Sequence, residues 1–367
     1  MIMRKILCLI FLLCLFINCG TRKEGAKGFK SLSLEEEFTL DTERKDLAER
    51  NFVDIGEFDV DSEGSIYIES EKSGENLIFK FDPKGSLIFS FAKKGQGPGE
   101  ILDATSLYVN DQDQVFIFDR MNSKTCLFSG EGNLIKEKKI DESFLEMCPL
   151  NNGNYLVRKS FPATADYLQD ESLMVVDPEL KEVAKLDGRK VPNFITGKRM
   201  KASIYILSWA VSDELIFTGF QERGYKISVY DFKGNLIREI KKDYEPVPVT
   251  EEYKKAFMKL FNDPLFDRVR DQIRKNIYFP SSLPPFHSFI SDDEGRLFVM
   301  TYKECDDPDD HMFDIFSKEG TFIGKAEISM SIENEGFNAE VTNDRFYCLR
   351  EKESGYRELV VSRMKWK

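Results

Sequence analysis

Few residues in this sequence have the type and spacing that catalysis or metal binding requires. The chain has two histidines, His287 and His311, and it lacks the GxSxG, P-loop, HExxH and C-x-x-C patterns. The acidic run at residues 306–311 offers oxygen ligands that suit calcium, but without the ordered spacing of a calcium loop. A solvated loop is therefore favoured. We expect no catalytic residue, no metal site and no cofactor, with calcium as the alternative.

Two further features could serve binding, and each also has a structural interpretation. His287 stands at the start of a predicted inner strand, yet a lone histidine close to Phe286 and Phe289 favours a packing role. The run Gly95-Gln96-Gly97-Pro98-Gly99-Glu100 resembles a phosphate-cradling loop in glycine content, but no helix follows it. We interpret this run as a connector between two structural units.

Composition narrows the choice of partners. Asp and Glu number 64 against 52 Lys and Arg, so the formal net charge is −12. Binding to phosphate backbones needs the opposite sign, and nucleic acid is therefore excluded as an expected partner.

The elements that would position these residues recur along the chain. An Asp-, Asn- or Gly-rich turn followed by an apolar strand occurs six times, at residues 61–68, 110–118, 151–157, 212–217, 292–299 and 342–348. A second tight turn between strands occurs five times, at residues 81–88, 128–135, 176–180, 230–237 and 316–323. Four antiparallel strands per unit, repeated around an axis, form a propeller. We predict an all-β, six-bladed β-propeller over residues 29–367.

One unit carries a specific family pattern. Residues 95–100, then 106–111, 115–119 and 127–128, resemble the NHL-type repeat, with Gly95, Gly97, Pro98, Gly99 and Glu100 as its motif. The whole chain resembles bacterial six-bladed propeller lipoproteins with NHL-like repeats, a family that implies a propeller fold and no single function. The other five units match in outline only.

The N-terminus predicts export. Arg4 and Lys5 precede an apolar run at residues 6–17 that is typical of a secretory signal and too short to span a bilayer. The run ends in Asn18-Cys19-Gly20, which resembles a bacterial lipobox, although Phe16 and Asn18 depart from the favoured residues. We predict a signal peptide at 1–18, lipid on Cys19, a tether at 19–28 and an extracytoplasmic location in the envelope of a bacterium. A plain cleaved signal or an uncleaved anchor are the alternatives.

Three further expectations concern the body of the protein. The last unit has three strands, so residues 32–40 should supply its fourth and close the ring. Residues 244–285 break the β pattern and predict a helical insertion before the fifth blade, with Thr250 as an N-cap and a second helix at about 265–276. The four cysteines Cys126, Cys148, Cys305 and Cys348 are expected to be free thiols, with disulfides as the alternative.

The two faces of a propeller differ in their connections. Turns joining first to second and third to fourth strands form one face, the tight-turn face, and the other connections form the long-loop face. The long segments 95–103, 159–171, 187–201, 244–285 and 305–311 all fall on the long-loop face, which we expect to bind a partner. Its candidate residues are the hot-spot types Arg120, Arg158, Arg199 and Arg223, the anchors Phe161, Tyr167, Phe194, Tyr278 and Phe279, and His287.

The sequence thus favours a monomeric, non-catalytic binding or scaffolding module for a protein, a peptide or a small polar ligand. A metal-dependent hydrolase or lyase of the lactonase-like propeller type is the alternative.

Overall fold

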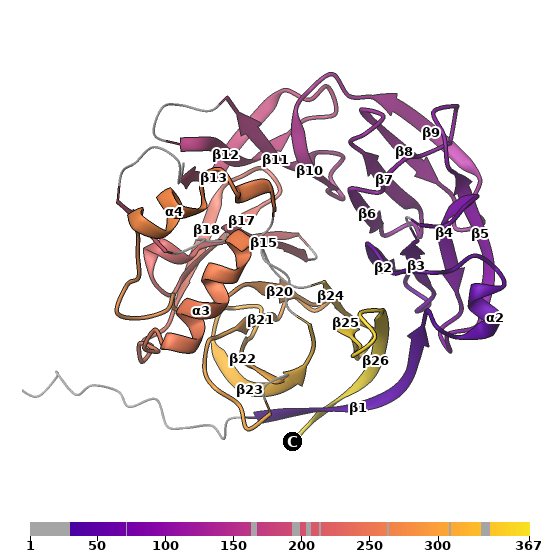
Figure 1. Ribbon diagram of the computed structural model, residues 1–367. Coiled ribbons are helices and arrows are strands. Elements are labelled where there is room, and N and C mark those ends of the chain that lie inside the picture. The colour runs from indigo at the N-terminus through magenta and orange to yellow at the C-terminus, as the bar shows by residue number, and fades with distance from the viewer. Residues whose placement is uncertain are drawn as a thin grey trace, which may run out of the picture.

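The structure of the protein, a computed structural model, describes residues 30–70, 72–162, 167–192, 199–202, 207–212, 214–262, 264–307, 310–331 and 338–367. Six four-stranded antiparallel units stand in a ring around a central axis (Figure 1). The predicted propeller arrangement is confirmed. A helical insertion separates the fourth and fifth blades, as predicted.

Each blade contributes four consecutive strands, except the last. The first three blades contain β2 (Phe58–Val60), β3 (Ile66–Glu69), β4 (Asn76–Phe81) and β5 (Leu87–Lys93); β6 (Ser106–Val109), β7 (Val115–Asp119), β8 (Lys124–Phe128) and β9 (Leu134–Lys139); and β10 (Phe144–Pro149), β11 (Tyr155–Phe161), β12 (Tyr167–Val176) and β13 (Glu182–Pro192). The last three contain β15 (Leu207–Ser212), β16 (Leu215–Phe220), β17 (Lys226–Asp231) and β18 (Leu236–Lys241); β20 (Phe289–Ser291), β21 (Leu297–Met300), β22 (Asp310–Phe316) and β23 (Phe322–Ser329); and β24 (Ala339–Thr342), β25 (Arg345–Glu351), β26 (Arg357–Trp366) and β1 (Lys30–Asp41).

The repeated turns share one hydrogen-bonding pattern. Asp82 Oδ1 accepts the backbone N–H groups of Lys84 and Ser86, at 2.9 and 2.8 Å. Gly85 between them has a φ of +80°, a conformation that glycine adopts without steric cost. The same two hydrogen bonds recur in five other turns. There the N–H groups of the residues two and four positions later donate to the side chain of Asp61, Asn110, Asp177, Asp231 or Asp292. Hydrogen bonds within the turn therefore stabilise the reversal of the chain at these six positions.

The ring closes through the N-terminal strand, as predicted for residues 32–40. β1 pairs antiparallel with β26 from Leu32 to Asp41, and its first residues pair parallel with β23. Glu37 of β1 accepts from Arg345 and Arg363 at 2.6 Å each. Strand pairing between the two ends of the chain leaves the last blade without a free outer edge.

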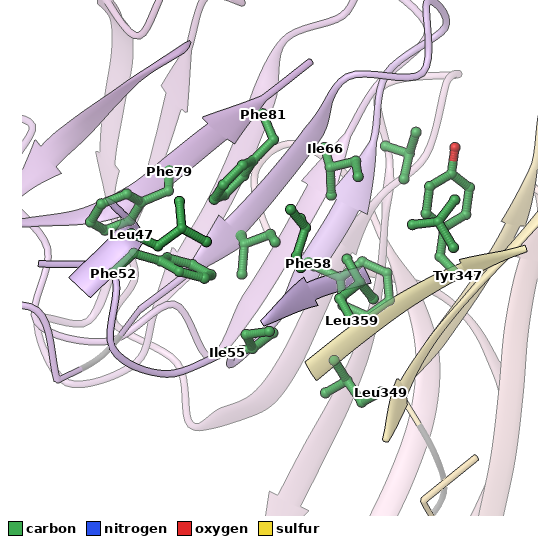
Figure 2. Packing of buried hydrophobic residues seen from close by; sticks show 14 residues of the cluster. Leu47, Phe52, Ile55, Phe58, Ile66, Phe79, Phe81, Tyr347, Leu349 and Leu359 are labelled. Carbon is green, nitrogen blue, oxygen red and sulfur yellow. The ribbon is translucent and has the colours of Figure 1, made fainter. Parts of the chain in front are cut away.

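The core of the closure lies between the first and last blades (Figure 2). Leu40 of β1 is fully buried with Leu359 of β26. The short helix α2 (Lys45–Ala48) adds Leu47, and Phe52 packs edge-on against Phe79 and Phe81. Each fully buried side chain of this kind contributes about 1.5–3 kcal/mol relative to exposure. The cluster joins residues from both ends of the sequence into one core.

The insertion is helical, with one boundary different from the prediction. α3 (Glu251–Lys259) begins at Thr250, whose Oγ1 accepts the N–H of Tyr253 at 3.2 Å, as expected of an N-cap. The second helix was predicted from about 265, but α4 spans Arg270–Asn276 and follows the single turns η2 (Leu260–Asn262) and η3 (Pro264–Phe266). Proline lacks an N–H and restricts the residue before it, which favours short turns over a longer helix.

Of two other expectations, the one about loops is wrong and the one about cysteines is confirmed. The segments 159–171 and 187–201 were predicted to be loops, but β11, β12 and β13 extend into both. Cross-strand ion pairs such as Arg189 with Glu171 at 2.7 Å stabilise these extensions. The four cysteines are free, as predicted: three are buried, and Cys305 is half-buried.

Candidate functional site

The first strands of the six blades surround the central channel. The inner strands around the ring are β2, β6, β10, β15, β20 and β24 (Figure 1). Each leads into the turn that joins it to the second strand of its blade, which belongs to the tight-turn face. The turns that follow these strands therefore meet at one mouth of the channel. Because such turns are rich in Asp and Asn, this mouth collects polar side chains from every blade.

The mouth contains a cavity of about 590 Å³. Six carboxylates line it, from Asp59, Asp61, Asp111, Asp113, Asp293 and Glu340. Among the described residues of its lining, none is Lys, Arg or His. A concave surface lined by one sign of charge concentrates ions of the other sign, so the cavity is suited to a positively charged ligand.

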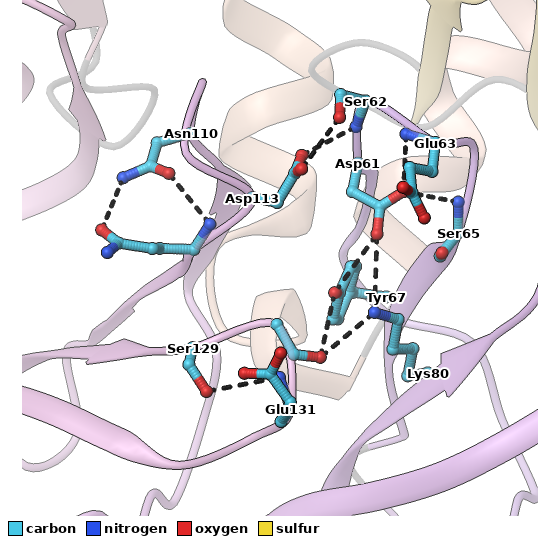
Figure 3. A network of polar contacts seen from close by, with 12 residues as sticks. Asp61, Ser62, Glu63, Ser65, Tyr67, Lys80, Asn110, Asp113, Ser129 and Glu131 are labelled. Atoms are coloured by element: carbon cyan, nitrogen blue, oxygen red, sulfur yellow. Dashed lines mark hydrogen bonds and ion pairs between the residues drawn. The ribbon is translucent and has the colours of Figure 1, made fainter.

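Hydrogen bonds between neighbouring blades hold the turns of the mouth in place. Ser62 donates its N–H and hydroxyl to Asp113 at 2.9 and 2.8 Å (Figure 3). Asp293 accepts the N–H of Asn343 at 3.0 Å, and the Asn343 amide donates to the carbonyl of Asp61 at 3.3 Å. These contacts link the fifth, sixth, first and second blades, so the mouth is preorganised.

One of the six carboxylates already has a cation. Asp61 is buried and accepts from the Tyr67 hydroxyl at 3.3 Å, and Lys80 Nζ lies 3.5 Å from its carboxylate (Figure 3). Although Asp61 lines the cavity, its charge is therefore neutralised within the protein. A ligand would meet the charges of Asp111, Asp113 and Asp293, together with the pair Asp59 and Glu340.

Asp59 and Glu340 form a pair of half-buried carboxylates on the adjacent strands β2 and β24. Asp59 accepts the N–H groups of Val60 and Val109 at 2.7 and 2.6 Å. Burial raises the pKa of Asp59 to about 7. Burial, and then the charge of Asp59, raise the pKa of Glu340 well above its usual value. The pair therefore retains a proton near neutral pH, which a bound cation would displace.

Three aromatic residues, Tyr108, Trp209 and Phe232, line the same cavity. The Trp209 indole donates to Glu146 at 3.1 Å, and Glu146 pairs with Arg158 at 2.8 Å. Arg158 lies 3.9 Å from Glu171, so an ion-pair network runs outward through the third blade. The network fixes the indole, and aromatic faces beside carboxylates suit an organic cation.

The predicted binding residues lie elsewhere. Arg120 is exposed in the turn after β7. Arg199 stacks over the ring of Tyr278, 5.2 Å from its centroid, where β14 (Met200–Lys201) pairs with β19 (Ile277–Tyr278). The structure thus brings together two of the residues predicted for the long-loop face.

The remaining candidates are tied into structural contacts or lie outside the description. Arg223, in the turn η1 (Gln221–Arg223), pairs with buried Asp187 at 2.6 Å, and Arg158 belongs to the network described above. His287 is buried with Nδ1 3.0 Å from the Ser288 hydroxyl, and burial lowers its pKa to about 4, which matches a packing role. The side chains of Tyr167 and Phe194 lie outside the described residues. None of the described candidates lines the central mouth.

The glycine-rich run connects the first and second blades, as predicted. The N–H of Gly97 donates to Glu100 at 2.8 Å, and Lys124 donates to the Gly97 carbonyl at 2.9 Å. A Cβ atom on Gly95 would lie 2.2 Å from Glu100 Oε2, so a larger residue there would displace the Glu100 carboxylate from Gly97. The N–H groups that a phosphate would use are taken: Gly97 donates to Glu100, Gly99 to Glu137 and Gly95 to the carbonyl of Ile101.

Sequence reasoning missed the mouth. The signal was present in the acids that end the first strands and begin the following turns, as in Asp59-Val60-Asp61 and Asp111-Gln112-Asp113. These residues were interpreted as turn formers only. Their second role follows from strand direction, which points all six turns to one mouth.

Comparisons with known proteins agree with this architecture. The model of the DUF5128 family, described as a 6-bladed beta-propeller, matches residues 49–200. The molecule is a six-bladed β-propeller. A search of curated proteins found no significant match.

Two solved structures from Bacteroides are similar over most of the chain. A protein of Bacteroides fragilis described as exported shares 14% identity with a TM-score of 0.51, covering 92% of this chain and 96% of that one. A member of the DUF4221 family from Bacteroides vulgatus shares 12% identity with a TM-score of 0.50, covering 92% and 98%. At these identities the likeness bears on the fold alone.

Several predictions fall partly or wholly outside the described residues. Cys19, the signal peptide and the tether precede residue 30, and two residues of the acidic run 306–311 are among the gaps. Within the described residues, no group of three His, Cys, Asp or Glu side chains is placed to hold a metal ion. No helix in the described part of the chain is long and apolar enough to cross a membrane.

Proposed function

We propose that the protein is an extracytoplasmic binding module, anchored by lipid on Cys19, whose ligand carries a positive charge and docks in the mouth of the central channel. The ligand is a protein, a peptide or a small polar molecule. The observation that carries the proposal is the acid-lined cavity, whose described lining includes no basic side chain. This binding site is on the tight-turn face, whereas the sequence favoured the long-loop face.

The size and chemistry of the mouth support a discrete ligand. Its volume of about 590 Å³ falls within the range of about 300–1,000 Å³ that small-molecule sites occupy. Asp111 and Asp293 are exposed at the opening, while Tyr108 and Trp209 supply rings for the apolar part of an organic cation. A lysine or arginine side chain of a peptide has this combination of charge and apolar stem.

The location rests on the sequence and on a relative. The signal-like residues 1–18 and the lipobox-like Asn18-Cys19 predict export and lipidation. The similar protein from Bacteroides fragilis is described as exported. A lipid on Cys19 would hold the propeller at a membrane surface.

Calorimetric titration with pentalysine, and with the same peptide acetylated on every lysine, tests the ligand site. We expect pentalysine to bind, acetylated peptide not to bind, and affinity to fall with salt because the attraction is electrostatic. Asp111→Asn with Asp293→Asn should weaken pentalysine binding about tenfold, or about 1.4 kcal/mol. Both substitutions keep an acceptor oxygen, so the turns should remain intact.

The control must separate the mouth from the general acidity of the chain. Glu131→Gln with Glu319→Gln removes two exposed charges from turns on the same face, away from the mouth. Equal weakening by the two pairs of substitutions would show a nonspecific attraction and would refute the mouth as the site.

Membrane fractionation tests the anchor. Cys19→Ala should move the protein from the membrane fraction to the soluble fraction. If the variant remains in the membrane fraction, lipidation at Cys19 is wrong, whatever the result with pentalysine.

A further inference from the structure

A second cavity, of about 770 Å³, lies between the fourth and fifth blades. Tyr225 precedes β17, Lys242 follows β18 and Thr301 follows β21, so these lining residues are at strand ends of the long-loop face. The cavity also reaches Asp314 of β22 and Phe322 of β23. Its volume falls within the range of about 300–1,000 Å³ that small-molecule sites occupy.

One wall of this cavity comes from the two ends of the helical insertion, which are bonded to each other. Val247 and the two prolines at 284–285 line the cavity. The carbonyl of Val247 accepts the N–H of Leu283 at 2.8 Å, and the N–H of Val249 donates to the carbonyl of Ser281 at 3.2 Å. Because backbone hydrogen bonds fix this wall, the cavity is preformed.

A buried carboxylate in the lining lacks one hydrogen-bond donor. Asp314 is 1% exposed, and its Oδ2 atom accepts from the Tyr225 hydroxyl at 3.0 Å and pairs with Lys242 Nζ at 2.5 Å. Its other oxygen, Oδ1, is buried and has no hydrogen-bond partner among the described residues. Such an acceptor is rare in folded proteins and needs a specific explanation. Because Lys242 already supplies the opposite charge, the missing partner is a neutral donor.

The charged side chains around this carboxylate balance one another. The described lining holds three lysines and three acids: Lys242, Lys303, Lys325, Asp243, Glu245 and Asp314. A concave site attracts an ion when one sign of charge prevails, and here neither sign does. Ammonium groups donate hydrogen bonds and carboxylates accept them, whereas a hydroxyl group does both. A neutral ligand with several hydroxyl groups therefore matches the polar part of the lining.

Aromatic rings provide the apolar part. Tyr225 and Tyr244 lie on the side of the fourth blade, with ring centroids 6.3 Å apart, and Tyr302 and Phe322 line the cavity from the fifth blade. The side chain of Tyr244 is 39% exposed, so a ligand can reach its ring. Aromatic side chains offer large apolar surfaces, against which the C–H groups of a saturated ring can pack.

We infer that this cavity is a second binding site, for a neutral sugar. A sugar ring carries C–H groups on its faces and hydroxyl groups at its edge, and these match the aromatic rings and the mixed donors and acceptors of the lining. One hydroxyl supplies the donor that Asp314 Oδ1 lacks. The mouth takes a charged ligand on the tight-turn face, and this cavity takes a neutral one on the long-loop face. The inference does not depend on the acidic mouth.

Calorimetric titration of the full chain with four neutral disaccharides, namely cellobiose, maltose, lactose and diacetylchitobiose, tests the class of ligand. At least one should bind at one site per chain, with the same affinity at low and high salt because the ligand carries no charge. Phenyl phosphate and benzylammonium, which combine a ring with a charge, should bind at least about tenfold more weakly. If none of the four sugars binds, or if either charged compound binds more tightly than all of them, the assignment is wrong.

Substitutions locate the binding. Tyr244→Ala should weaken sugar binding about tenfold with an unchanged melting temperature, whereas Tyr356→Ala, at a tyrosine 50% exposed in the last blade, should leave it unchanged. Asp314→Leu with Lys242→Met removes the free acceptor without leaving a lone buried charge and should abolish sugar binding. Pentalysine should bind all these variants as it binds wild type, which separates this site from the acidic mouth. A folded Tyr244→Ala protein with wild-type affinity for the sugar would refute the site, even where the double variant does not fold.

Discussion

Replacing Glu340 with Gln should stabilise the protein above pH 7 and reduce the dependence of its stability on pH. Glu340 and Asp59 lie on the adjacent first strands β24 and β2, and both line the acidic mouth. Burial is the largest cause of the raised pKa of each carboxyl, and nearby charge adds to it, from Asp61 at Asp59 and from Asp59 at Glu340. Gln keeps the shape and an acceptor oxygen while removing the charge.

The size of the effect follows from the pKa of Asp59. It is about 7 in the folded protein, against about 3.9 in an unfolded chain, and three pKa units correspond to roughly 4 kcal/mol. Between these pH values the folded state binds more protons than the unfolded state, so the free energy of unfolding falls as pH rises. The contribution of Asp59 to the free energy of unfolding is therefore fully present below about pH 4 and is lost as the pH rises through 7.

Urea denaturation at pH 5, 6, 7 and 8 measures this dependence. For wild type we expect Asp59 to lower the free energy of unfolding by about 2–4 kcal/mol between pH 5 and 8. Glu340, whose pKa is also raised, adds its own loss of stability as pH rises, and this part should disappear in Glu340→Gln because Gln cannot ionise. Glu131→Gln, which removes an exposed carboxylate, should follow wild type and so controls for other titrating groups, including His287. A pH dependence in Glu340→Gln identical to that of wild type would refute the raised pKa of Glu340.

Three further predictions concern the scaffold. Leu40→Ala should lower the free energy of unfolding by about 3 kcal/mol because it empties a buried position at the closure, whereas Leu236→Ala, at a side chain 54% exposed, should cost less than about 1 kcal/mol; equal values in urea denaturation would contradict the closure. Gly95→Ala should cost about 1–3 kcal/mol through the clash with Glu100, while Gly74→Ala, where a Cβ meets no atom within 4 Å, should not lower the melting temperature. Ellman's reagent should label Cys305 in the native protein and reach Cys126 and Cys348, whose pKa burial raises to about 12, only after unfolding; fast labelling of Cys126 would contradict its burial.

The fold could be predicted from the sequence because local chemistry determines it. An Asp or Asn side chain that accepts the N–H groups of the residues two and four positions later marks six of the turns, as at Asp82 and Asp231, and these residues are visible without a structure. The missing fourth strand of the last blade likewise pointed to β1. Both inferences depend on neighbours in sequence or on simple strand counting, and the structure confirms both.

The candidate site could not be predicted in the same way because it depends on distant residues. Asp59 and Glu340 come from opposite ends of the chain, and only ring closure makes their strands neighbours. Arg158 and Arg223 were chosen for residue type, but Glu146 and Asp187 pair with them in the folded state. A sequence shows that an arginine is present and does not show which carboxylate has already neutralised it.

The contrast between these two groups of charges supports a binding role for the mouth. In the third blade, Glu146 and Glu171 each lie beside an arginine, as in a network that stabilises the fold. At the mouth, the charge of Asp61 adds to the raised pKa of Asp59, the charge of Asp59 adds to that of Glu340, and no basic residue is present in the described lining. Burying like charges together lowers stability, and apolar residues there would be more stabilising. Such clusters occur where a ligand supplies the missing charge, and a cation in this mouth would do so.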